Sequence, residues 1–317
     1  MAAAVTPAGD YSNGFEYPNW DGWNGKMVTG TLPSTSSDAT SELWWQGYLP
    51  PESEKPVAIA IFAHGIQENS SRYNHLLQGM AKEGNIAAFS MDHVNHGYSY
   101  KAGKKRPSGY FSSLENVLDD WAAFFKFAKG YFPGQDLPVY MLGQSFGAMV
   151  TILTAMRRDV EPAGVILTAA FINVPRNCFL KALELVAYPA TRVVPKARLI
   201  AAAAPKLMSN IPKAVKDYVD DPLVNTANIA SLPGYLMNNE TYWLEKEKGA
   251  FSYPLLMFHG TKDACCSYDH AAAFCESVSS SDKEFVPVQD GYHLLWSGPS
   301  KESILRKIVQ FVHAQAN

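Results

Sequence analysis

The chain has 317 residues, of which 47% are hydrophobic, and its formal net charge at neutral pH is −3. This length and apolar content suffice for one large α/β domain with an insertion, or for two domains, and they exclude disorder for most of the chain. The net charge gives no reason to expect nucleic acid as a partner.

The sequence shows no sign of export or of a membrane span. No apolar run is long enough to cross a bilayer, and the first 13 residues lack a basic stretch followed by an apolar one. The four cysteines fit neither a disulfide framework nor the spacing of a zinc site, so we expect reduced thiols. These features predict a cytoplasmic enzyme whose contact with membranes, if any, is peripheral.

Residues 1–42 are predicted to form an N-terminal extension that leads into edge strands, because clusters of Gly, Pro, Ser and Thr interrupt them. From Val57 on, short apolar runs alternate with helical patterns, which is typical of a parallel sheet with crossover helices. One such helix is expected from Leu114, with Ser112 in its capping box. The predicted strands span residues 57–63, 86–91, 138–142, 164–170, 254–258 and 284–288.

The most informative motif is a serine between two glycines, Gly143, Ser145 and Gly147, where the strand 138–142 gives way to a helical pattern. In that context G-x-S-x-G is typical of a nucleophile elbow, a tight turn whose strained backbone exposes the serine hydroxyl. Side chains at the two glycine positions would collide with the neighbouring strand or helix. Ser145 is the predicted nucleophile; the alternative is a glycine-lined turn with a solvated serine.

About eighty residues separate the strand 164–170 from the strand 254–258, more than a single crossover helix needs. We therefore predict a cap insertion, residues 172–237, on a core of residues 43–171 and 238–317. Between positions 172 and 217 the insertion has eight Lys or Arg and two acidic residues among many apolar ones. This composition fits a cap that contacts an anionic membrane surface, although an ordinary solvated helical cap is the more common explanation of a local charge excess.

A serine hydroxyl needs a histidine to take its proton and an acid to orient that histidine. In folds with this elbow, the acid and then the histidine follow the serine, each after a later strand. Asp263 comes just after the strand 254–258 and is the predicted acid, while His293 lies in a turn after the strand 284–288 and is the predicted base. The competing candidates are His313, Asp220, Asp221, Asp269 and Asp290.

An oxyanion hole needs two backbone N–H groups, one from the residue after the nucleophile and one from a loop near the first central strand. The first is predicted to come from Phe146. The second is predicted to come from Ile66, because His64 and Gly65 close the strand 57–63 and the glycine lets the backbone approach a substrate.

Several segments together resemble the monoacylglycerol lipase and lysophospholipase branch of the α/β-hydrolase family. They are the runs 62–73 and 92–99, the elbow, the His-Gly-Thr-Lys-Asp segment that ends at Asp263, and the Gly-Tyr-His segment that ends at His293. The resemblance extends from residue 58 to the C-terminus, is weak in the insertion and is absent from the N-terminal extension. It implies the α/β-hydrolase fold, a mostly parallel central sheet flanked by helices, with a helical cap (lid) over an apolar acyl tunnel.

The resemblance also implies roles for residues near the triad. Glu68 and Arg72 would bind substrate at the polar end, near the glycerol group; a salt bridge at the start of a helix is an equal alternative. Cys266 falls where this branch keeps a thiol near the site. Trp296 stands where the branch has another histidine at the headgroup end, so it is expected to contact the substrate. The chain departs from this branch at four positions. Gln67 replaces a glycine usual in the oxyanion loop, Gln144 and Phe146 replace the usual histidine and methionine of the elbow, and Ala148 replaces a glycine.

Asp92, His93 and His96 have the side chains of a zinc site, but two histidines three apart in a loop are a weak signal, so no metal and no cofactor are expected. The sequence thus predicts a serine hydrolase that cleaves fatty-acyl esters through an acyl-enzyme, foremost monoacylglycerol to glycerol and free fatty acid. Its partner would be a lipid or ester small molecule. The alternatives are a lysophospholipase, a general carboxylesterase and a non-catalytic ligand-binding protein that keeps this fold.

Overall fold

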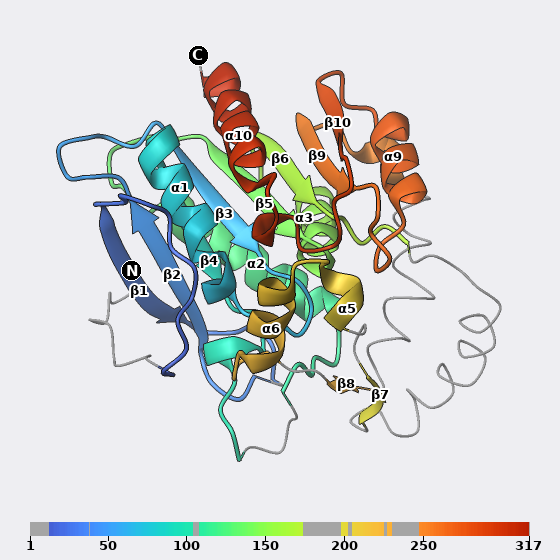
Figure 1. Ribbon diagram of the computed structural model, residues 1–317. Helices are drawn as coiled ribbons and strands as arrows, with labels where there is room; N and C mark the ends of the chain where they lie inside the picture. Colours follow the sequence, from blue (N-terminus) through green and yellow to red (C-terminus); the bar gives the residue numbers. More distant parts are fainter. Residues whose placement is uncertain are drawn as a thin grey trace.

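The computed structural model describes residues 13–37, 39–103, 108–173, 198–201, 205–224, 227–229 and 247–316. Its centre is an eight-stranded sheet in the order β1-β2-β4-β3-β5-β6-β9-β10 (Figure 1). From β4 to β10 all neighbours pair in parallel, whereas β2 runs antiparallel to both of its neighbours. The strands are β1 (Lys26–Leu32), β2 (Leu43–Leu49), β3 (Ala58–Ala63), β4 (Ile86–Met91), β5 (Val139–Gln144), β6 (Gly164–Thr168), β9 (Leu255–Gly260) and β10 (Lys283–Val288).

Helices cover both faces of this sheet (Figure 1). On one face lie α1 (Asn74–Gly84) and α10 (Lys301–Ala316). On the other face lie α2 (Leu114–Lys129), α3 (Phe146–Arg157) and α9 (Tyr268–Ser277). The short 3-10 helices are η1 (Ser70–Tyr73), η2 (Gly97–Ser99), η4 (Lys248–Ala250) and η5 (Leu295–Ser297). None of the helices in the described ranges is both long and apolar enough to cross a bilayer.

The mostly parallel sheet flanked by helices is confirmed, and each of the six predicted strands is present with ends that differ by two residues or fewer. Residues 26–32, within the predicted extension, form the edge strand β1. The predicted cap of α2 was wrong by one residue: the Oγ atom of Ser113, not Ser112, accepts the backbone N–H of Glu115, at 3.1 Å.

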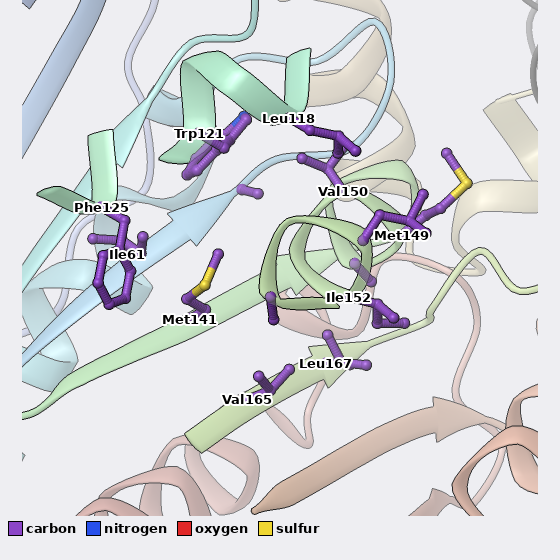
Figure 2. Packing of buried hydrophobic residues seen from close by; sticks show 14 of the residues in the cluster. Ile61, Leu118, Trp121, Phe125, Met141, Met149, Val150, Ile152, Val165 and Leu167 are labelled. Carbon is purple, nitrogen blue, oxygen red and sulfur yellow. The ribbon is translucent and has the colours of Figure 1, made fainter. Parts of the chain in front are cut away.

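The central strands are buried on both faces, which is why they appear in the sequence as continuous apolar runs rather than alternating ones. On the face shown in Figure 2, Ile61 of β3, Met141 of β5 and Leu167 of β6 pack below α2 and α3. From the helices, Trp121 of α2 and Val150 of α3 fill the space above them. This packing fixes the N-terminus of α3, and with it residue 145, at the carboxyl end of β5.

Much of the predicted cap insertion, residues 172–237, lies outside the described residues. The described part contains two helices, α5 (Pro205–Met208) and α6 (Pro212–Asp220), and two short antiparallel strands, β7 (Arg198–Ala201) and β8 (Ala227–Ile229). The strands were not predicted. The backbone N–H of Leu294 donates to the carbonyl of Met208 at 2.8 Å, so the described cap helices lie beside the loop that carries His293.

Candidate active site

Ser145 occupies a strained turn between β5 and α3. Its φ is +55° and its ψ is −120°, a combination that costs an L-residue about 1–3 kcal/mol and occurs mostly at functional sites. The neighbouring glycines allow the close crossing: a Cβ atom on Gly143 would lie 2.5 Å from the carbonyl oxygen of Gly147, and one on Gly147 would lie 2.1 Å from that of Ala63. The local structure is the one that the G-x-S-x-G pattern indicates.

Asp263 lies at the carboxyl end of β9 and is surrounded by hydrogen-bond donors. Its Oδ2 atom accepts from Nδ1 of His293 at 2.9 Å and lies 3.3 Å from Nε2 of His259. Its Oδ1 atom accepts the backbone N–H groups of Cys265 and Cys266 at 2.8 and 3.0 Å. Burial by itself would raise the pKa of Asp263, but the charge of His293 and hydrogen bonds from both histidines hold the pKa well below its usual range.

His293 is buried beside this carboxylate and is oriented by it. Because Nδ1 bonds to Asp263, Nδ1 carries the proton and Nε2 is left as the basic atom in the neutral ring. Burial lowers the pKa of His293, whereas the charge of Asp263 raises it, and the net result is a pKa well above the ordinary 6.5. The carboxylate of Asp263 therefore increases the basicity of the imidazole of His293.

The thiol of Cys266 lies between the serine and the histidine. Its Sγ atom is 4.0 Å from Oγ of Ser145, and the thiol also bonds to His293. Burial raises the pKa of Cys266, so the group is a protonated thiol at neutral pH and a poor nucleophile. Within the described residues, Ser145 and His293 form no direct hydrogen bond; such contacts often tighten only when substrate binds.

The competing acids lie elsewhere. Asp290 is exposed and pairs with Lys262 at 2.7 Å. Asp221 is buried at the end of α6, and Asp220 pairs with Lys216 on the surface of that helix. His313, the other candidate base, contacts the carbonyl of Gly84 through Nε2 at 2.8 Å on α10. Asp263, and none of these competing residues, is bonded to the ring of His293.

The predicted oxyanion loop follows β3 and lies beside the elbow. A Cβ atom on Gly65 would lie 3.6 Å from Cβ of Ser145 and 2.5 Å from Oε2 of Glu68, so this turn passes close to the serine. Gln67 has a φ of +64°, a left-handed conformation that glycine adopts without strain. Ile66 lies in this turn, and Phe146 is the first residue of α3.

Asp92 and His93 use their polar atoms to support the segment after β3, whereas Nδ1 of His96 contacts the nearby carbonyl of Val94 at 2.9 Å. Asp92 accepts from the backbone N–H and the hydroxyl of Ser70, each at 2.7 Å. His93 accepts the indole N–H of Trp121 through Nδ1 and contacts the carbonyl of His64 through Nε2. Burial lowers the pKa of His93 and of His96, to about 3 and about 4, so both rings are neutral at physiological pH. These contacts give the cluster a structural role.

A second group has the chemistry of metal ligands. One ligand atom each from Asp263, Cys266 and His293 lie within 4.8 Å of one another. The carboxylate, however, already accepts bonds from two imidazoles and two backbone amides, and a thiolate ligand would have to form at a group whose pKa burial raises. The donor set fits an acid–base pair better than a metal centre.

Glu68 and Arg72 form a buried ion pair, with Nε of Arg72 3.1 Å from Oε1 of Glu68. Both also have other protein partners. Glu68 accepts the hydroxyl of Tyr73 at 2.6 Å, and Arg72 bonds to Asp221 at 3.3 Å and lies over the ring of Tyr218, 5.0 Å from its centroid. The ion pair of the sequence-based alternative is therefore present, and it extends to the described cap helix α6.

Trp296 lies in η5 and is 4% exposed. Its indole N–H donates to Oγ1 of Thr168 at 3.3 Å, and its side chain packs with the residues under α1 and α10. Contact with substrate, expected because of its position after His293, stays a prediction.

Three residues make contacts at the site that sequence reasoning did not identify. His259 begins the segment that ends at Asp263, and its place at the end of a strand was a usable signal. Gln144 and Asp221 had no comparable signal, because their partners come from segments more than a hundred residues away.

Replacing Asp221 by asparagine should lower the free energy of unfolding by about 3 kcal/mol, because Arg72 loses one buried charged partner. Asp220→Asn is the matched control on the same helix, since Asp220 is half-exposed and its ion pair should contribute less than about 1 kcal/mol. Urea unfolding measures both changes. Equal losses in the two variants would contradict the buried ion pair as a link between core and α6.

Comparison with known proteins agrees with this geometry. The family model described as Hydrolase_4, serine aminopeptidase, S33, matches residues 54–300. Monoglyceride lipase of Rattus norvegicus is 27% identical over 243 residues, 77% of each chain, and that of Homo sapiens is 28% identical over 240 residues, 76% of each chain.

Solved structures show the same fold. A monoacylglycerol lipase of Paleococcus ferrophilus matches with a TM-score of 0.71 at 23% identity, over 86% of this chain and 99% of that one. A monoglyceride lipase variant of Saccharomyces cerevisiae, solved with a substrate analog, matches with a TM-score of 0.78 at 15% identity, over 92% of this chain and 96% of that one. The chain belongs to the Hydrolase_4 (serine aminopeptidase, S33) family and has the fold of these lipases, the α/β-hydrolase fold.

Proposed function

We propose that this carboxylic ester hydrolase cleaves monoacylglycerol to glycerol and a free fatty acid through an acyl-enzyme. The observation that carries the proposal is the 2.9 Å bond between Asp263 and His293, at the ends of two neighbouring strands and beside the strained Ser145. The monoglyceride lipases among the relatives support the ester as the bond that is cleaved.

In the proposed mechanism, Oγ of Ser145 attacks the ester carbonyl while Nε2 of His293 takes its proton. Asp263 keeps the ring in the required tautomer and stabilises the imidazolium that forms. The backbone N–H groups of Ile66 and Phe146 would hold the oxyanion, where one such donor contributes about 10²–10³ in turnover. His293 then returns the proton to the leaving alcohol, and water releases the fatty acid by the same steps in reverse.

The domain organisation follows the same proposal. We propose residues 43–171 and 238–317 as the hydrolase core, to which the preceding residues 1–42 add the edge strand β1, and residues 172–237 as the cap through which the acyl chain would enter. The contacts of Met208 with Leu294 and of Asp221 with Arg72 support a cap fixed at two points near the site. We propose that Glu68 and Arg72 contact the polar end of the substrate while they also pair with each other, and Arg72 with Asp221.

The alcohol that leaves is the least constrained part of the proposal. Arg72 is engaged by Glu68 and Asp221, and Trp296 by Thr168, so recognition of glycerol has less support than cleavage of the ester. A general carboxylesterase is the alternative that these contacts favour, because it needs no group that recognises the alcohol; a lysophospholipase stays a prediction from the sequence.

A fluorophosphonate should label the folded wild-type protein, and Ser145→Ala should abolish labelling. Cys266→Ala is the control: it removes the neighbouring thiol and should retain labelling, because the thiol is protonated. Mass spectrometry of the labelled peptide identifies the residue. Hydrolysis should then be compared over monoacylglycerols, lysophospholipids and short esters. An unlabelled, folded wild type would indicate a ligand-binding protein instead.

The rate constant kcat/KM should rise with pH through a pKa above 6.5, because His293 acts as a base only when neutral and its pKa is raised. Asp263→Asn should lower kcat by about 10⁴ and move this midpoint to lower pH, since the raising charge is lost. Asp290→Asn, three residues before His293 and exposed, is the control and should change neither. A midpoint unaffected by Asp263→Asn would contradict the assigned acid.

We also propose that the cap contacts anionic membranes. On the described part of the cap, α5 and α6 carry Lys206, Lys213 and Lys216 as well as the exposed apolar side chains of Leu207 and Val219. Lys213 and Lys216 also pair with Asp217 and Asp220, one turn further along α6, so these carboxylates offset part of the positive charge. Lysines at an anionic surface contribute about 1 kcal/mol each, and the apolar side chains would enter the headgroup region.

The protein should therefore bind vesicles that contain anionic lipid more tightly than neutral vesicles, with affinity that falls as salt rises. Replacing the three cap lysines by glutamate should abolish the preference. The matched control replaces Lys126 and Lys129 by glutamate, because they lie in the last turn of α2, which leads to the amino end of β5 and not to the carboxyl end where Ser145 lies. Co-sedimentation at two salt concentrations measures this; equal, salt-insensitive binding to both vesicle types would contradict the proposal.

A further inference from the structure

A chain of three buried side chains runs beneath the elbow and ends on the main chain of His293. The amide of Gln144 donates from Nε2 to the carbonyl oxygen of His293 at 3.0 Å. The hydroxyl of Thr168 donates to Oε1 of Gln144 at 2.5 Å, and the indole N–H of Trp296 donates to Oγ1 of Thr168 at 3.3 Å. The three residues are 0%, 2% and 4% exposed, so water does not compete for these bonds.

The direction of each bond is set by chemistry. The carbonyl of His293 can only accept and the indole N–H can only donate. The amide of Gln144 must therefore present its NH₂ group to His293 and its oxygen to Thr168, whose hydroxyl donates to that oxygen and accepts from Trp296. Each polar nitrogen and oxygen atom of these three side chains thus has at least one partner, as a buried polar network requires.

This chain ties the loop of the predicted base to the strands that carry the predicted nucleophile. Gln144 is the last residue of β5, directly before Ser145, and it pairs in register with Thr168 of β6. His293 and Trp296 stand at the two ends of the same short turn, and both are bonded to this pair. Asp263 holds the ring of His293, while Gln144 holds its main chain.

We propose that Gln144 is a positioning residue, whose amide fixes the main chain of His293 and thereby the separation between its imidazole and Ser145. The proposal rests on the function proposed above. A misplacement of about 1 Å at reacting atoms reduces turnover by about 10². Because Gln144 directly precedes Ser145 in the chain, its bonds to His293 and Thr168 connect the serine to the loop of the histidine. The connection is direct and does not have to pass through the other strands of the sheet.

The test compares Gln144→Met, which keeps the length of the side chain and removes both bonds, with Thr151→Val. Thr151 is the matched control, because its buried hydroxyl donates to the carbonyl of Leu142 in the same strand without touching His293. Both variants should lose stability. Per active site titrated with fluorophosphonate, Gln144→Met should lose about 10- to 100-fold in kcat with KM nearly unchanged, and Thr151→Val should keep its kcat.

Gln144→Glu supplies a readout that a purely structural role would not move, and it serves also if Gln144→Met fails to fold. A protonated carboxyl can still donate to the carbonyl of His293, whereas a carboxylate cannot. The ratio of kcat/KM between this variant and the wild type should therefore fall as pH rises. A pH-independent ratio, or unchanged kcat in Gln144→Met, would overturn the proposal. A wild type that is inert to fluorophosphonate and esters would instead overturn the proposed function.

Discussion

The candidate site depends on keeping one carboxylate, Asp263, charged in the interior of the protein. A buried carboxylate without partners is unfavourable by several kcal/mol, so its donors must be in place before the site can exist. Here two imidazoles and two backbone amides surround it. His259 comes from β9 itself, the amides from the loop after β9, and His293 from the loop after β10. The parallel pairing of β9 with β10 brings these loops together.

The same edge of the sheet carries the strained serine. A residue at φ +55° persists only where its surroundings fix it, and here the surroundings are the buried strand β5 before it and the apolar helix α3 after it. The packing of α3 against β3 and β5 compensates the strain, and Gly147 permits the approach to Ala63. The acid–base pair and the serine thus depend on one structural element, the carboxyl edge of the parallel strands.

The buried arginine gives the site a second kind of constraint. Arg72 lies between Glu68 of the core and Asp221 of the cap segment, and Asp221 also accepts from Asn69 and from the hydroxyl of Tyr17 near the N-terminus. The carboxylate of Asp221 thus connects three segments of the chain, namely the N-terminal segment, the core loop after β3 and the cap segment. These contacts fix the relative positions of the segments, because removing one partner leaves the remaining charges buried and less well compensated. Residues that look like substrate ligands in the sequence therefore also hold the architecture together.

The sequence by itself determined the six parallel strands, the elbow around Ser145 and the positions of Asp263 and His293 after strands. These features are local: apolar runs reflect burial, glycines reflect a close crossing, and chain order reflects the succession of strands. The sequence had no means of showing that His259 shares the carboxylate of Asp263, that Gln144 reaches the carbonyl of His293, or that Arg72 pairs with Asp221. Only the tertiary structure decided these contacts, because each joins side chains whose proximity depends on packing around them rather than on local pattern.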